Sequence, residues 1–152
     1  MGETLAEIQD RTFARSRPST ADSFSPTTRL SAHELEAYLD RRTFGVASTA
    51  RPDGRPHAAM TSYYRRDEIF WLPTVADAVR VRNVEHQPWI SLVIPEGDRD
   101  EHIMVAIEGT AELVAPIDAP SDVVGQVGEW AGVWIRLTAK RVLSYGAPNT
   151  RA

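Results

Sequence analysis

Apolar and polar residues alternate with a period of two in several segments of this chain. Between residues 89 and 94, Ile90, Leu92 and Ile94 share one face, and two later segments repeat the pattern. Successive side chains of a strand point to opposite faces of a sheet, so this alternation indicates half-buried β-strands. We expect six strands, over residues 43–49, 56–64, 68–72, 89–94, 102–113 and 133–144.

The segments between these strands carry turn signals rather than long helices. Arg51-Pro-Asp-Gly54 has proline second and glycine last, which is typical of a turn between hairpin strands. Gly109 falls inside an expected strand and indicates a bulge or bend there. Short strands joined mainly by hairpins favour an antiparallel barrel over a parallel α/β sheet. The pattern therefore predicts a mainly β fold with a few short helices.

Two helices have recognisable starting residues. Ser31-Ala-His-Glu34 is a capping box, and Leu30 is placed to staple a helix that ends near Arg41. Ser121 is a candidate cap for a short helix that continues to about Trp130. We expect core or interface positions for all four tryptophans, Trp71, Trp89, Trp130 and Trp134.

A third helix, expected after Asp77, has the features of an anion site. With Asp77 as N-cap, Ala78, Val79 and Arg80 fill the first turn, where free backbone N–H groups and the positive end of the helix dipole face outward. Arg80 adds a charge-assisted donor for a phosphate, and shares its edge of the helix with Asn83. The alternative is a solvated basic helix without a ligand.

Residues 14–29 are rich in Ser, Thr and Pro and lack hydrophobic periodicity. We therefore expect a flexible N-terminal arm over residues 1–29, one folded domain over 30–146 and a C-terminal tail over 147–152. Removal of the arm, to about residue 28, is expected to cost little thermal stability.

Composition limits the classes of function. The chain has 152 residues, no cysteine and a net charge of −4. These values favour one cytoplasmic domain without disulfides or thiolate metal sites, and argue against a general nucleic-acid binder. The four histidines lack ligand spacing, so no metal is expected, and no apolar run is long enough to cross a membrane.

Three segments in order carry a family resemblance: residues 44–57, residues 74–83 and Gln87-Pro-Trp-Ile-Ser-Leu-Val93. Together they resemble the pyridoxamine 5′-phosphate oxidase-like flavin-binding split-barrel family, over about residues 30–145. The likeness is closest to the actinobacterial branch whose members use FMN or the deazaflavin coenzyme (F-420). It implies a six-stranded, Greek-key antiparallel split barrel that forms a homodimer with the cofactor at the subunit interface.

The resemblance also implies where the cofactor lies. Its ring would follow the strand after the Pro-Asp-Gly turn, beside Ala58, Ala59, Met60, Thr61 and Ser62. The positions implied near the phosphate or tail are Thr74, Arg80, Arg82 and Asn83, and His57 could donate a hydrogen bond or a proton. We expect Met60 to fill the barrel, which leaves Ala59 and Thr61 facing the ring. Small polar residues on an outward strand face are, however, also ordinary.

One departure bears on the cofactor. Family members usually have Ser-Arg-Lys where this chain has Ala78-Val79-Arg80. Loss of a charge-assisted partner costs about 1.5–3 kcal/mol per contact. Arg82 could compensate, and weaker FMN binding, the deazaflavin coenzyme or an empty site all stay open.

The implied function is a flavin- or deazaflavin-dependent oxidoreductase that transfers hydride to or from a small organic substrate, with no catalytic side chain required. The alternative is a non-catalytic flavin-binding or storage protein, or a degenerate split barrel. Oxidation of pyridoxamine phosphate itself is disfavoured, because the tail after Ser144 lacks a basic cluster for a substrate phosphate.

Overall fold

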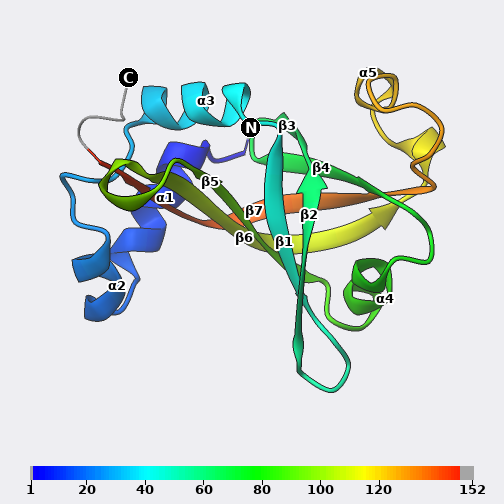
Figure 1. Cartoon of the computed structure of the whole chain (residues 1–152), viewed down its shortest axis with the longest axis horizontal. Helices are drawn as coiled ribbons and strands as arrows, with labels where there is room; N and C mark the ends of the chain where they lie inside the picture. Colours follow the sequence, from blue (N-terminus) through cyan, green and yellow to red (C-terminus); the bar gives the residue numbers. More distant parts are fainter. Residues whose placement is uncertain (1, 148–152) are drawn as a thin grey trace.

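Seven antiparallel strands form one curled sheet in the computed structural model, which describes residues 2–147 (Figure 1). Their order is β2-β1-β5-β6-β7-β4-β3. The strands are β1 (Phe44–Ala50), β2 (Pro56–Ser62), β3 (Tyr64–Arg66), β4 (Ile69–Thr74), β5 (Trp89–Glu96), β6 (Ile103–Val114) and β7 (Val133–Gly146). The mainly β, antiparallel barrel fold predicted from the sequence is confirmed, with seven strands in place of the expected six.

The extra strand arises because the strand expected over residues 56–64 is divided at Tyr63. β2 pairs with β1, whereas β3 pairs with β4, so consecutive strands lie at opposite ends of the sheet. Tyr63 is buried, donates its hydroxyl hydrogen to the Leu39 carbonyl at 2.7 Å and packs against Phe70. One residue cannot span a flat sheet of this width, and the sheet therefore curls until its two ends meet.

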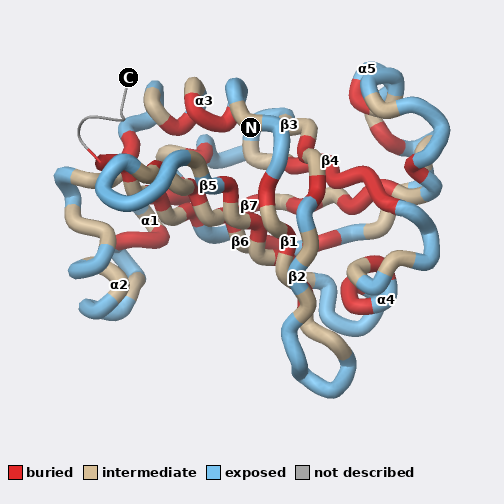
Figure 2. Tube along the Cα trace, viewed as in Figure 1, coloured by how far each residue is buried: buried red, intermediate tan, exposed pale blue. Residues whose placement is uncertain are grey.

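The core lies within this curl and follows the predicted alternation (Figure 2). Ile90, Leu92 and Ile94 are fully buried on β5. The predicted irregularity at Gly109 is confirmed, because the β6–β7 register shifts there. A Cβ at Gly109 would lie 1.9 Å from the Thr138 carbonyl oxygen, so only glycine allows this approach of the two strands.

Short helices flank the sheet. They are α3 (Ala32–Arg41), α4 (Val79–His86) and α5 (Ser121–Val124), with 3₁₀ turns η1 (Arg99–Glu101) and η2 (Pro116–Asp118). α3 begins with the predicted Ser31 capping box. Two predicted caps are wrong: α4 has Ala78 as N-cap instead of Asp77, and the shorter α5 has Pro120 instead of Ser121.

The prediction of a flexible N-terminal arm over residues 1–29 is wrong. This segment contains two helices, α1 (Leu5–Ala14) and α2 (Pro18–Ser23). α1 packs along β7, with Leu5, Ile8 and Phe13 buried. A Thr4 capping box with Glu7 starts the helix. The sequence contained this signal, followed by the helix-spaced apolar residues Leu5 and Ile8, and the prediction missed it.

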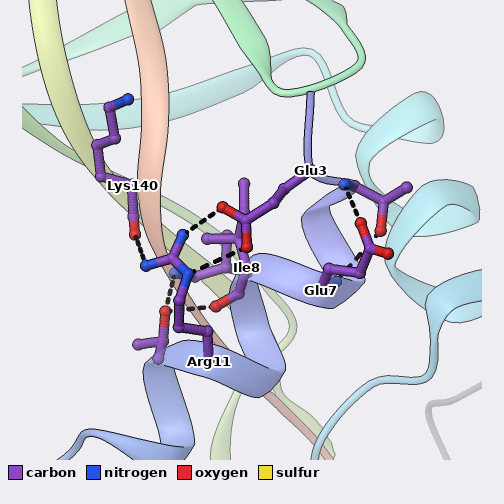
Figure 3. A network of polar contacts seen from close by, with 8 residues as sticks. Glu3, Glu7, Ile8, Arg11 and Lys140 are labelled. Atoms are coloured by element: carbon purple, nitrogen blue, oxygen red, sulfur yellow. Dashed lines mark hydrogen bonds and ion pairs between the residues drawn. The ribbon is translucent and has the colours of Figure 1, made fainter. Parts of the chain in front are cut away.

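Hydrogen bonds fasten α1 to the sheet. The Thr12 hydroxyl accepts from the Val142 backbone N–H of β7 at 3.1 Å, and the Gln9 side-chain oxygen accepts from the Ser144 hydroxyl of β7. At the surface, the Arg11 guanidinium pairs with Glu3 and donates to the Lys140 carbonyl (Figure 3). Of the expected tail over 147–152, only Ala147 falls within the described residues.

Among residues 2–147, no helix combines the length and apolar character needed to span a bilayer.

We predict that Ile8→Ala lowers the free energy of unfolding by about 2–5 kcal/mol, because it leaves a cavity between α1 and the sheet. Asp10→Ala, at an exposed position of the same helix, should change it by less than about 0.5 kcal/mol. Denaturant unfolding measures both. An Ile8→Ala variant as stable as the parent would contradict this prediction and would mean that α1 adds little to the stability of the fold.

Candidate functional site

Arg80 bridges β2, at one end of the strand order, and β4, the strand next to the other end. One terminal nitrogen donates to the Met60 carbonyl on β2 and the other to the Pro73 carbonyl on β4, both at 3.3 Å. The side chain is half-buried, and its Nε is covered without a hydrogen-bond partner. Burial lowers the pKa of the guanidinium, since desolvation penalises the charged form. Within residues 2–147 no carboxylate pairs with Arg80, so an incoming anion would find an uncompensated charge.

The first turn of α4 contains Arg80, as predicted. Its N-cap, Ala78, has no side chain that can accept a hydrogen bond, so no cap satisfies the first backbone N–H groups. These N–H groups and the Arg80 guanidinium belong to the same turn of helix. Together they have the chemistry of an anion site.

Asn83 lies on the other side of α4 from solvent, contrary to the prediction that it shares an exposed edge with Arg80. It is 2% exposed, and its side-chain amide donates to the Thr49 hydroxyl of β1 at 2.9 Å. Asn83 therefore fastens α4 to the sheet and sets the position of Arg80 one turn earlier.

The faces of β2 are exchanged relative to the prediction. Met60, expected to be buried, is 66% exposed, whereas Thr61 and Tyr63 are buried. The Thr61 hydroxyl can face inward because it donates to the Ser62 carbonyl at 2.9 Å, which satisfies its donor locally. Ala59 lies on the same inner face as Thr61, and Ala58 shares the outer face with Met60.

β2 also presents an unpaired edge. It ends the strand order, and its Met60 carbonyl points away from β1 toward Arg80. In an antiparallel strand the N–H and C=O of one residue point to the same side, so the N–H groups of Met60 and Ser62 face this free edge. The edge thus offers both donors and acceptors to a planar ligand.

A cavity of about 230 Å³ opens beside Arg80 and this edge. Its lining residues are Phe44, Met60, Thr61, Ser62, Pro73, Arg80 and Trp130. Four of these were candidates from the sequence, and Phe44, Pro73 and Trp130 were missed. The exposure of Phe44, Met60 and Trp130 leaves an apolar rim around the cavity. No local sequence signal marks the missed residues, because Phe44 comes from β1, Pro73 from β4 and Trp130 from the loop before β7.

The other candidates lie outside the cavity lining. Thr74 is buried at the end of β4, opposite Val133, and Arg82 is exposed on α4. His57 is half-buried near the start of β2, and its Nδ1 is covered without a partner. His102, directly before β6, stacks on Tyr145.

Comparison with known proteins adds the family. Residues 31–149 match the family model described as Pyridoxamine 5′-phosphate oxidase. A conserved hypothetical protein from Mycobacterium tuberculosis has a similar structure, with a TM-score of 0.68 and 23% identity over 82% of this chain and 89% of the other.

Two further solved structures share the fold. An FAD-binding protein from Mesorhizobium loti has a TM-score of 0.61 and 20% identity, over 76% of this chain and 92% of its own. The heme storage protein HutZ from Vibrio cholerae has a TM-score of 0.62 and 16% identity, over 78% and 96%. At these identities the likeness shows the fold alone.

We predict that Asn83→Ala lowers the free energy of unfolding by about 1–3 kcal/mol, because the buried Thr49 hydroxyl loses its partner. Arg82→Ala, at the adjacent exposed position, is the matched control and should stay within about 0.5 kcal/mol of the parent. The double variant with Thr49→Ala should cost less than the sum of the two single changes. Additive losses, measured by denaturant unfolding, would mean that the two side chains act separately.

Proposed function

Because the chain belongs to the pyridoxamine 5′-phosphate oxidase family, we propose that it binds a flavin beside Arg80 and acts as an oxidoreductase. The observation that carries this proposal is the Arg80 guanidinium, half-buried at the edge of a largely apolar cavity and without a counter-ion among residues 2–147. Desolvation of a cation is costly unless an anion repays it. The phosphate of FMN is such an anion.

The residues of the site fit the two parts of FMN. Arg80 and the uncapped first turn of α4 suit the phosphate. The apolar surfaces of Phe44, Pro73 and Trp130 suit a flat ring, and the free N–H groups of Met60 and Ser62 suit its polar edge. A bound flavin supplies hydride transfer, while these residues orient it and exclude water. Of the candidates predicted from the sequence, we retain Arg82, His57 and Thr74 only as outer contacts of the cofactor.

We further propose that a second copy of the chain completes the site. A volume of about 230 Å³ is below the roughly 300–1,000 Å³ typical of ligand pockets, so one protomer encloses only part of a flavin. The apolar rim of Phe44, Met60 and Trp130 is exposed in the monomer and is suitable for burial in a twofold interface.

The deazaflavin coenzyme is the alternative cofactor. Val79 leaves the phosphate without the second cation usual in the family, and a different phosphate-bearing tail would place its anion differently. A binding or storage protein is the second candidate function. It is favoured by the lining of the cavity, in which no side chain titrates near neutral pH and could act as a general acid or base.

Titration of the full-length protein with FMN, riboflavin and the deazaflavin coenzyme tests the proposal. We expect FMN to bind more tightly than riboflavin, because only FMN carries a phosphate. Equal affinities would contradict the Arg80 phosphate site, and absence of binding to all three would contradict the proposed function. Turnover of the reduced cofactor with candidate substrates then separates an oxidoreductase from a carrier.

We predict that Arg80→Ala weakens FMN binding about tenfold to hundredfold, the equivalent of about 1.5–3 kcal/mol, and leaves riboflavin binding nearly unchanged. Arg80→Lys should restore part of the loss, because it keeps the charge. Arg17→Ala, at the exposed N-cap of α2, is the charge-matched control. Parallel losses for FMN and riboflavin would show that Arg80 acts only by bridging β2 and β4.

A further inference from the structure

A second cavity, of about 320 Å³, adjoins the one beside Arg80. Phe44 and Ser62 line both cavities, so a molecule in the second would lie next to a molecule in the first. The second cavity lies between the end of α3, β3 and the residues around α5. It is therefore placed where a substrate would meet a cofactor bound beside Arg80.

The walls of this cavity carry more positive than negative charge. Arg42, Arg65 and Arg66 line it, against the single carboxylate of Asp40. Arg65 is the deepest of the three: its side chain is 8% exposed, and its Nε is covered without a hydrogen-bond partner. Its guanidinium pairs with two carboxylates, Glu36 and Asp40, of which only Asp40 lines the cavity.

Three of the four carboxylates that pair with these arginines lie outside the cavity lining. Arg65 bonds to Glu36 and, at 2.8 Å, to Asp40, Arg66 pairs with Asp122, and Arg42 pairs with Glu96 at 3.3 Å. Glu36, Asp40 and Asp122 are well exposed, and the Glu96 side chain is 35% exposed. Exposed carboxylates are screened by water and contribute little to an ion pair. Of these carboxylates only Asp40 lines the cavity, so an anion there would face three guanidinium groups and could take the place of an exposed partner.

The remaining lining is suited to an organic molecule. Phe44, Tyr63 and Tyr64 supply aromatic surface, and Ser62 and Gln126 supply hydrogen-bonding groups. We propose that this cavity is the substrate subsite of the protein and that it takes a small aromatic or apolar carboxylate. The proposal rests on the proposed flavin site and concerns binding only.

Calorimetric titration of the full chain with benzoate, and with benzamide as its uncharged isostere, tests the subsite. We expect benzoate to bind at least about tenfold more tightly than benzamide, because a charged hydrogen bond is roughly twice as strong as a neutral one. Benzamide binding equal to that of benzoate, or no benzoate binding at all, overturns the proposal.

Two variants place the ligand in this cavity without disturbing buried residues. Arg66→Gln removes an exposed cation, and Gln126→Glu adds an anion at an exposed position of the wall. Each should weaken benzoate binding several-fold and leave benzamide binding unchanged, whereas Arg17→Gln should alter neither. Benzoate affinity that is the same in both variants as in the parent overturns the assignment.

FMN titration of the same preparations separates this inference from the proposed function. FMN binding without benzoate binding overturns the subsite alone. Benzoate binding that responds to Arg66→Gln, in a protein that binds no flavin, supports the anion cavity and contradicts the flavin function.

Discussion

Continuity of the chain through Tyr63 is the constraint on which the rest of the structure depends. β2 and β3 follow each other in sequence but terminate opposite ends of the strand order, so the sheet is closed by a covalent link rather than by a full ladder of hydrogen bonds. The seam left between β2 and β4 is where backbone groups stay available, and Arg80 bridges it. The candidate site lies there because the barrel is closed through the chain but is not fully paired by backbone hydrogen bonds.

Much of the fold was predicted from local sequence patterns. The alternation of Ile90, Leu92 and Ile94, the Ser31 capping box and the bulge at Gly109 are each encoded within a few neighbouring residues, and each was predicted. The break at Tyr63 was not, because residues 56–64 read as one continuous strand. Which partner each half pairs with depends on strands far away in sequence.

The candidate site shows the same division. Arg80 in the first turn of α4 was predicted from its helix, but its contacts with β2 and β4 depend on tertiary structure. Met60 was assigned inward by size, whereas the local hydrogen bond of the Thr61 hydroxyl lets the smaller polar residue take the inner face. The Thr4 capping box was local as well, but the composition of the following segment obscured it.

The packing of α1 against β7 joins the first helix of the chain to its last strand. During synthesis at about 5–20 residues per second, roughly 7–27 seconds separate the emergence of Phe13 from that of Gly146. Over that interval the apolar face of α1, with Leu5, Ile8 and Phe13, has no strand to cover it. The buried face of α1 can therefore reach its final packing only after β7 has left the ribosome.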